Sequence, residues 1–384
     1  MKFEFATATR IVFGLGRLAE IGDMAKSFGS SALVVTGGNP GRAAELLEPL
    51  SAEGISQTVY PVHGEPKISD VRTGVERAKA GKCDMVISFG GGSAIDCGKA
   101  ISAMMTNSGD VLDYIEVIGR GNAITEQAAP FIAIPTTSGA GTEVTKNAVL
   151  ASPDHSVKAS LRSVLMLPRI ALVDPELTFN LPPDITASTG MDALTQLIEP
   201  YTCCRTNPLT DAVCRDGIPR IARSLRAAFK NGHDAAARED MSAAAMFGGL
   251  ALANSGLGAV HGFAAPLGGI FPAPHGAVCA ALLPPVMEAN LKALTERYAE
   301  SEAIARYTRI ARLLTGNDNA RAEDGVEWVR QLAADLQIPK LREYGIKASD
   351  FPELVSKAAK ASSMKANPLP LSEAELSKIL TAAW

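Results

Sequence analysis

The fold is decided by D-M-V-I-S-F-G-G-G-S-A-I-D, residues 84–96. The stretch begins with a short apolar run, continues through three glycines, and ends where a helical pattern starts. A continuous apolar strand is typical of a parallel sheet covered on both faces. The glycines let the backbone approach a ligand closely, and the start of the helix presents free N–H groups to it. The stretch predicts a phosphate-binding turn between a buried strand and a helix; a tight structural turn is the alternative.

The first half of the chain repeats this alternation of strand and helix. We expect strands at 31–36, 58–62, 84–89, 131–135 and 170–174, with helices at 43–50, 69–80 and 94–105. Pro182 and Pro183 then interrupt the chain, and Asp184 is suited to cap a new helix. Helical patterns follow at 184–200, 208–230, 236–256, 275–295, 299–315, 321–337, 350–362 and 372–380. The chain therefore predicts an α/β domain with a parallel sheet over residues 1–182 and an all-α domain over 183–384.

Composition excludes several classes of protein. The net charge is −4 and no run of Lys and Arg forms a basic face, which argues against a nucleic-acid partner. Residues 241–260 carry no charge but are rich in Ala and Gly, so we expect a buried core helix and no membrane span. The N-terminus has no apolar core of signal-peptide length. Six cysteines without metal-finger spacing suggest a reducing compartment, which predicts a cytoplasmic protein.

Two further segments offer ligand contacts. P-T-T-S-G-A-G-T-E, residues 135–143, places hydroxyls and small residues after another strand end, where α/β sheets bind ligands. A Ser/Thr-rich loop with no ligand is the alternative. Lys158 and Arg162 form an i,i+4 basic pair, which is either structural or a source of positive charge for a polar or acidic carbonyl substrate.

A metal site is suggested by residues of the second half. Asp192 and Gln196 lie four apart, on one face of an expected helix. His261 and His275 are each followed by glycine, and a Gly/Pro-rich turn joins them; His275 opens the next helix. One carboxylate and two imidazoles would hold Fe²⁺ or Zn²⁺ and leave positions open for substrate. The alternative is a pair of ordinary core histidines beside a helix surface.

Six ordered motifs carry a family resemblance: G-G-G-S-A-I-D (90–96), P-T-T-S-G-A-G-T-E (135–143), A-L-V-D-P (171–175), T-G-M-D-A-L-T (189–195), the two-histidine segment (258–278) and N-P-L-P-L-S (367–372). Through them the chain resembles, almost end to end, the iron-containing (group III) alcohol dehydrogenases with their dehydroquinate-synthase-like fold. The resemblance implies an N-terminal dinucleotide-binding domain and a C-terminal domain for metal and substrate, with the active site in the cleft. It also suggests a homodimer or larger oligomer, in which the segment F-E-F-A-T (3–7) is a candidate pairing strand.

The same resemblance implies a set of site residues. The family holds its metal with an Asp and three His, and these positions correspond here to Asp192, Gln196, His261 and His275. Family members often carry a further histidine four residues after the one that matches His261, and here that position is Ala265. Three interpretations of Gln196 are open: it completes the metal shell as a weak ligand, a water takes its place, or the site is empty as purified and another cation stabilises the alkoxide. We expect metal binding to be retained. Asp192, His261 and His275 are the predicted catalytic residues. The predicted cofactor-binding residues are Gly37, Gly38, Asn39, Gly90, Gly91, Gly92, Ser93, Asp96, Thr136, Thr137, Ser138, Thr142 and Lys158.

The predicted reaction is hydride exchange between a nicotinamide ring and an alcohol or aldehyde substrate, with the metal as Lewis acid. Gly37 stands where NAD-using relatives tend to place an Asp, and Arg42 is near enough in sequence to meet a 2′-phosphate, which favours NADP(H) over NAD; if Asn39 binds the ribose, NAD serves. Three alternatives remain open: an acidic-ketone reductase similar to maleylacetate reductases, a dehydroquinate-synthase-type lyase, and a nucleotide-binding protein without a metal.

Overall fold

The computed structural model describes residues 2–155 and 157–384. Contacts between Cα atoms divide the chain into two compact units. The α/β unit comprises Ala6–Thr137 and Gly141–Thr178. The helical unit comprises Phe179–Trp384, residues 2–5 and Ser138–Ala140. The short segment Ser138–Ala140 thus packs with the helical unit although it lies within the sequence of the other.

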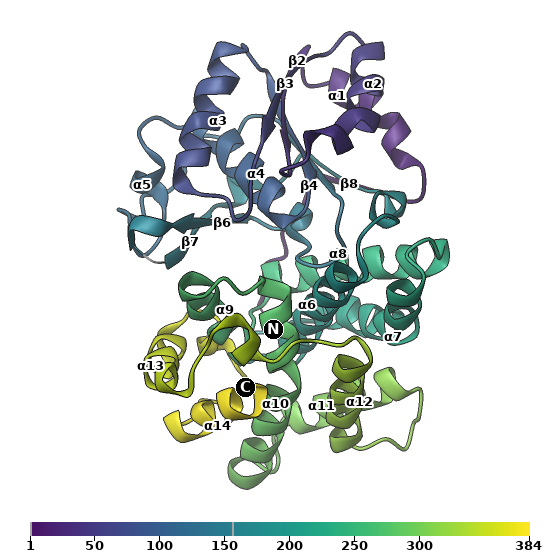
Figure 1. Ribbon diagram of the computed structural model, residues 1–384, viewed down its shortest axis with the longest axis vertical. Helices are drawn as coiled ribbons and strands as arrows, with labels where there is room; N and C mark the ends of the chain where they lie inside the picture. Colours follow the sequence, from purple (N-terminus) through teal and green to yellow (C-terminus); the bar gives the residue numbers. More distant parts are fainter. Residues whose placement is uncertain (1, 156) are drawn as a thin grey trace. The chain divides into compact units, whose positions relative to one another are not determined.

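The α/β unit is built on a six-stranded sheet in the order β1-β8-β5-β4-β2-β3 (Figure 1). Every neighbouring pair runs parallel, which confirms the predicted parallel sheet. The strands are β1 (Arg10–Phe13), β2 (Ser31–Thr36), β3 (Ser56–Pro61), β4 (Met85–Gly90), β5 (Phe131–Pro135) and β8 (Ile170–Val173). β1 is absent from the sequence prediction because it is an edge strand of four residues with only one buried side chain. The predicted pairing segment 3–7 lies outside any strand of this chain.

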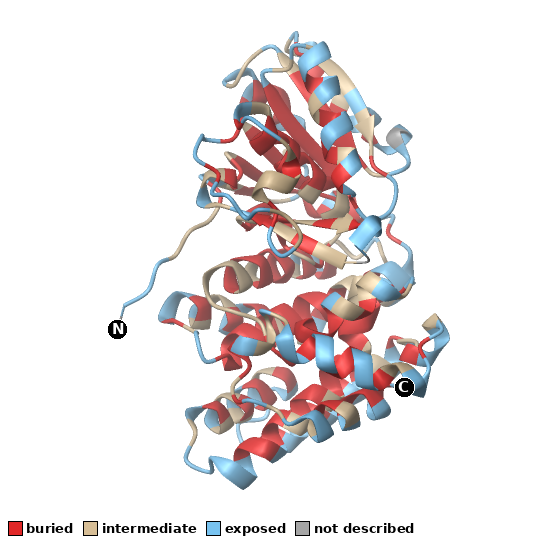
Figure 2. Cartoon of the chain, turned by 90° about the vertical axis from the view of Figure 1, so that its left-hand side faces the viewer, coloured by how far each residue is buried: buried red, intermediate tan, exposed pale blue. Residues whose placement is uncertain are grey.

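Helices cover both faces of this sheet. Leu33 and Val35 of β2 belong to one apolar core, whereas Ala32 and Val34 belong to another. Successive residues of a strand point to opposite faces, so these two cores are the two sides of the sheet. The covering helices are α1 (Ile21–Lys26), α2 (Ala44–Ala52), α3 (Ile68–Ala80), α4 (Gly92–Thr106) and α5 (Val111–Tyr114). Figure 2 shows the resulting concentration of buried residues in the strands.

A hairpin that the sequence did not predict completes this unit. β6 (Asn147–Ser152) and β7 (Val157–Arg162) pair in antiparallel fashion. The interpretation of Lys158 and Arg162 as a pair is wrong, because both lie on β7, where residues four apart are about 13 Å apart. Each has its own acidic partner: Lys158 lies 2.9 Å from Glu65 and Arg162 lies 3.5 Å from Glu116.

The helical unit begins at α6 (Pro183–Thr202). Pro183 occupies the first helical position, where its missing N–H costs nothing, so Asp184 lies in the first turn and does not cap the helix as predicted. The remaining helices are α7 (Pro208–Lys230), α8 (Ala235–Asn254), α9 (Ala259–Ile270), α10 (His275–Arg297), α11 (Glu302–Thr315), α12 (Ala322–Asp335), α13 (Phe351–Lys360) and α14 (Glu373–Ala383). Ser372 and Glu375 form the predicted capping box of α14. Short 3-10 segments lie at Arg17–Glu20, Pro40–Ala43, Thr142–Val144, Pro153–His155, Val164–Met166, Pro175–Thr178, Leu341–Tyr344, Ala348–Asp350 and Met364–Ala366.

Two features of the apolar helices differ from what their sequences suggest. The segment after Gly258, interpreted as a loop, is the helix α9, and α8 and α9 meet at an angle of 96°. By length and composition α10 passes as a membrane span, but 72% of its most apolar window is buried inside the protein. Side chains of α6, α8, α9 and α10 belong to one apolar core, so these are core helices of the unit.

Candidate metal centre and nucleotide-binding turns

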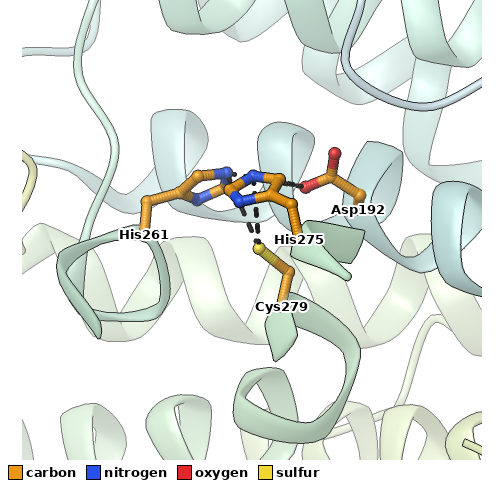
Figure 3. Close-up of side chains that lie close together, drawn as sticks. All are labelled: Asp192, His261, His275 and Cys279. Carbon is orange, nitrogen blue, oxygen red and sulfur yellow. Dashed lines mark hydrogen bonds and ion pairs between the residues drawn. The ribbon is translucent and has the colours of Figure 1, made fainter. Parts of the chain in front are cut away.

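Four side chains from three helices meet inside the helical unit (Figure 3). Asp192 comes from α6, His261 from α9, and His275 and Cys279 from α10. One donor atom of each lies within 4.8 Å of the donor atoms of the other three. Asp192 Oδ1 is 3.6 Å from His261 Nε2 and 3.7 Å from His275 Nε2. We call these residues the four-residue cluster; three of them are predicted ligands.

The position of His261 depends on how α9 begins. The N-cap residue, Gly258, has no side chain to satisfy the first N–H groups of the helix. Two distant side chains accept them instead: Asn367 Oδ1 accepts from Ala259 N at 3.1 Å, and Glu199 Oε1 from Val260 N at 2.7 Å. A Cβ at residue 258 would lie 2.8 Å from Glu199 Oε1, so only glycine fits there. Asn367 opens the N-P-L-P-L-S motif, which thereby fixes the first turn of α9.

Glu199 also orients the imidazole of His261. Its Oε2 accepts a hydrogen bond from His261 Nδ1 at 2.7 Å. A proton held on Nδ1 leaves the lone pair of Nε2 directed at the cluster, which is the usual arrangement of a histidine that ligates a metal. Sequence reasoning missed Glu199. The signal was its spacing, because it follows Asp192 by seven residues and so shares one face of α6.

Cys279 is the second residue that sequence reasoning missed. It follows His275 by four residues on α10, and its Sγ lies 3.7 Å from His275 Nε2 and 3.9 Å from His261 Nε2. The H-x-x-x-C spacing at the start of a predicted helix was the available signal, since it puts both side chains on one helical face.

The side chains of the cluster shift one another's pKa values. Burial by itself raises the pKa of Asp192, but the charges of His275 and His261 outweigh burial and leave this pKa below its usual value. The electrostatic interaction with Cys279 raises the pKa of His275 to about 9, against the lowering effect of burial. Burial lowers the pKa of His261, yet Cys279, Asp192 and Glu199 together raise it well above its ordinary value. The surroundings of the two histidines thus favour a positive charge at this site.

Gln196, the remaining predicted ligand, contacts Asp192. Its Nε2 donates to Asp192 Oδ2 at 3.0 Å. Among the described residues, neither Gln196 Oε1 nor Asp192 Oδ1 has a hydrogen-bond partner, although both atoms are buried. Buried polar atoms are normally satisfied, so an unsatisfied Asp192 Oδ1 that lies 3.6 Å and 3.7 Å from two imidazole nitrogens fits a bound cation. The donor set therefore suits a divalent metal.

The two predicted nucleotide turns lie side by side in the α/β unit. β4 and β5 are adjacent, with Gly90 opposite Pro135, and Thr136 N donates to Gly90 O at 2.9 Å. Thr137 lies beside Gly91, close enough that a Cβ there would be 3.5 Å from its Cγ2. Gly91 is the N-cap of α4 and gives no side-chain hydrogen bond to the helix start, while Gly92 and Ser93 form its first turn. Open N–H groups at a helix start of this kind suit a phosphate.

Other predicted cofactor residues have partners within the protein. Thr142 Oγ1 donates to Asp96 Oδ1, and Asp96 Oδ2 accepts from Val149 N at 3.0 Å. The buried ammonium of Lys99 donates to Thr142 O at 2.7 Å and to Thr145 O at 2.8 Å. We call Asp96, Lys99, Thr142 and Thr145 the Lys99 network; no sequence motif pointed to Lys99.

The remaining predicted residues are divided among several places. Ser138 Oγ lies 3.0 Å from Ser242 Oγ of α8, within the helical unit. Gly37 and Gly38 follow β2, and the ring of His63 lies so close that a Cβ at Gly38 would be 2.8 Å from its Nδ1. Asn39 Oδ1 accepts from Gly41 N at 3.2 Å and caps the short helix Pro40–Ala43. Lys158 is the partner of Glu65.

Comparisons with known proteins agree along the whole chain. A model of iron-containing alcohol dehydrogenases matches residues 8–175, and a model of the C-terminal part of the same family matches residues 186–384. The 1,3-propanediol dehydrogenase of Citrobacter freundii is 34% identical over 100% of this chain and 99% of its own. The choline dehydrogenase of Bacillus subtilis (strain 168) is 35% identical over 96% and 92% of the two chains.

Solved structures give the same result. The crystal structure of a 1,3-propanediol oxidoreductase superposes with a TM-score of 0.93 at 33% identity over the full length of both chains. A sulfoacetaldehyde reductase from Bifidobacterium kashiwanohense, solved in complex with NAD+, superposes with a TM-score of 0.89 at 27% identity over 100% and 99% of the two chains. The chain therefore belongs to the iron-containing alcohol dehydrogenase family and is a metal-dependent, NAD(P)-linked oxidoreductase that interconverts alcohols with aldehydes or ketones.

Proposed function

We propose that alcohol oxidation takes place at the four-residue cluster, where Asp192, His261 and His275 hold a divalent ion, Fe²⁺ or Zn²⁺. The observation that carries this proposal is the buried, unsatisfied Asp192 Oδ1, which lies 3.6 Å and 3.7 Å from the two imidazole Nε2 atoms. When bound, such an ion would polarise the alcohol oxygen as a Lewis acid, and a nicotinamide ring would accept the hydride.

The protein's own residues would prepare this site in distinct ways. Asp192 supplies negative charge from a position that Gln196 Nε2 fixes through its second oxygen. Glu199 holds the ring of His261 so that Nε2 stays available. Ala265, one turn after His261 on α9, is exposed, and its methyl group has no exchangeable proton. We therefore infer that the alcohol proton leaves through water or a ribose hydroxyl of the cofactor.

We propose that the α/β domain, residues 1–182, binds the dinucleotide and that residues 183–384 bind metal and substrate. The adjoining turns at Gly90–Ser93 and Thr136–Thr137 support the phosphate site, because they combine open helix N–H groups with hydroxyls at the carboxyl ends of β4 and β5. The side chains of Asp96 and Thr142 are hydrogen-bonded to each other. We therefore expect them to support this site without contacting the nucleotide directly.

We propose NADP(H) as the preferred nucleotide. Gly37 leaves no carboxylate at the end of β2 to repel a 2′-phosphate, and Arg42 is exposed in the helix that follows. The comparison of kcat/KM for NADP+ and NAD+ tests this, together with Arg42→Ala, which should lower kcat/KM for NADP+ alone. Equal or better use of NAD+ by the unmodified enzyme would contradict the preference.

We further propose that the enzyme acts as a homodimer or larger oligomer in the cytoplasm. The support for the compartment is that all six cysteines are free thiols. Light scattering on the purified protein measures the oligomer directly, and a monomeric mass would contradict it.

Metal analysis of freshly purified protein tests the central proposal, coupled to a panel of alcohols and aldehydes with both nucleotides. We expect about one divalent ion per chain, loss of turnover in chelator, and recovery when Fe²⁺ or Zn²⁺ is returned. Full activity in chelator, with a clear deficit of metal, would defeat the metal-dependent mechanism.

A further inference from the structure

Gln196 occupies a position where the family's ligand set has a histidine, and Cys279 supplies a different donor atom nearby. Cys279 Sγ lies 3.7 Å from His275 Nε2 and 3.9 Å from His261 Nε2. It is a free thiol that is fully buried, and it faces the imidazoles from the next turn of α10 (Figure 3). Buried free cysteines commonly act as small apolar side chains, but this sulfur lies beside two imidazole nitrogens.

The donor atoms have the spacing of a metal shell. Four of the distances between Asp192 Oδ1, the two Nε2 atoms and Cys279 Sγ are 3.6, 3.7, 3.7 and 3.9 Å, and no two donors of the cluster are more than 4.8 Å apart. Atoms about 3.7 Å apart at the corners of a tetrahedron lie about 2.3 Å from its centre, close to the bonds of roughly 2.0–2.3 Å that Zn²⁺ makes to oxygen, nitrogen and sulfur. The four donor atoms are thus close enough to one another to bind a single ion.

Gln196 is engaged in another way. Its Nε2 donates to Asp192 Oδ2, the carboxylate oxygen that does not approach the histidines. The amide therefore holds Asp192 with Oδ1 directed at the two imidazoles. An amide that fixes a carboxylate in this way acts as a positioning residue and leaves the place of the missing imidazole to another donor.

We propose that the Cys279 thiolate is a protein ligand of the metal, so that the ligand set is Asp192, His261, His275 and Cys279, with Gln196 positioning Asp192. This inference rests on the metal site proposed above. A thiolate is softer than imidazole or an amide oxygen, and it shifts the preference of the site toward Zn²⁺ and away from the ion for which the family is named.

Cobalt substitution tests this ligand directly, because a thiolate bound to Co²⁺ gives an intense charge-transfer band in the near ultraviolet. The full-length protein is freed of metal, loaded with Co²⁺, and compared with Cys279→Ser, Gln196→Ala and Cys214→Ser. Cys214 is the matched control, a buried cysteine of α7 outside the cluster. Circular dichroism checks that each variant folds.

We expect the band in the wild type, in Gln196→Ala and in Cys214→Ser, and its loss in Cys279→Ser. The Zn²⁺ dissociation constant, measured by chelator competition, should rise at least about 100-fold in Cys279→Ser and only about 10–100-fold in Gln196→Ala, as expected for an outer partner. Stoichiometric Co²⁺ without the band in the wild type would overturn the thiolate ligand and leave the proposed metal site intact. Failure of the wild type to bind Co²⁺ or Zn²⁺ would overturn both. If Cys279→Ser fails to fold, Cys279→Ala takes its place, because a band in the wild type alone does not identify which of the six cysteines binds.

Discussion

Two largely buried polar groups of this protein, the Lys99 network and the four-residue cluster, differ in how their atoms are satisfied. Lys99 Nζ contacts three backbone carbonyls and the hydroxyl of Thr145, and Asp96 accepts from a hydroxyl and an amide. At the cluster, Oδ1 of Asp192 and Oε1 of the neighbouring Gln196 have no hydrogen-bond partner among the described residues. A buried network that is complete stabilises a fold, whereas an incomplete one is suited to a ligand.

This comparison predicts a large loss of stability from Lys99→Met. The substitution leaves the carbonyls of Thr142, Thr145 and Asn147 and the carboxylate of Asp96 without their cation, and we expect the free energy of unfolding to fall by about 3–5 kcal/mol. Urea unfolding measures this, with Lys357→Met, from an exposed pair with Glu353, as the control that should change little. A folded variant as stable as the wild type would show that the network is not structural.

The cluster should behave in the opposite way, with stability that depends on added metal. At a metal concentration about 100 times the dissociation constant, binding should raise the free energy of unfolding by about 2.7 kcal/mol. Asp192→Asn should lose this gain, because the charge between the two histidines is removed. Thermal unfolding with and without Zn²⁺ is the measurement, and Asp216→Asn, from an exposed ion pair with Arg220, should keep the gain. A metal response that survives in Asp192→Asn would place the ion elsewhere.

Glu199→Gln should have a smaller effect on the same site. The amide keeps the shape of the side chain but weakens the charge-assisted hydrogen bond that orients His261 through Nδ1. We expect the metal dissociation constant to rise by about 10–100-fold. Chelator competition measures it beside Glu353→Gln, an exposed glutamate that should leave affinity unchanged. No change in Glu199→Gln would mean that His261 is held by packing alone.

The smallest expected effect, when it is taken per pH unit, is a pH dependence near the Lys99 network. Burial raises the pKa of Glu143 to about 7 from 4.5, although the charge of Lys99 opposes it. The folded state then holds a proton that the unfolded state has lost between pH 4.5 and 7, so this stabilising contribution is present below pH 4.5 and lost as the pH rises through 7. The expected slope is about 1 kcal/mol per pH unit. Unfolding of wild type against Glu143→Gln across this range should show the slope only in the wild type; parallel curves would contradict it.

Local pattern explains which parts of the fold were predictable. The strand Ser31–Thr36 and the start of α10 at His275 are marked by apolar runs, glycines and prolines, and the structure confirms both. The helix α9 was missed because its Gly and Pro residues disfavour a helix in isolation. It forms because Glu199 and Asn367 accept its first N–H groups from positions 61 and 108 residues away along the chain. Such partners cannot be read from the helix's own sequence.

The sequence by itself determined the parallel sheet, the glycine turn ahead of α4, the helical second half and the family, because each of these depends on local periodicity or on an ordered set of motifs. Only the tertiary structure decided which polar residues meet. It brought Cys279 to the histidines, gave Glu199 to His261 and turned Gln196 toward Asp192. The physical reason is that a metal shell and a buried hydrogen-bond network are defined by distances of a few ångströms between helices, and these distances depend on the packing of the whole unit.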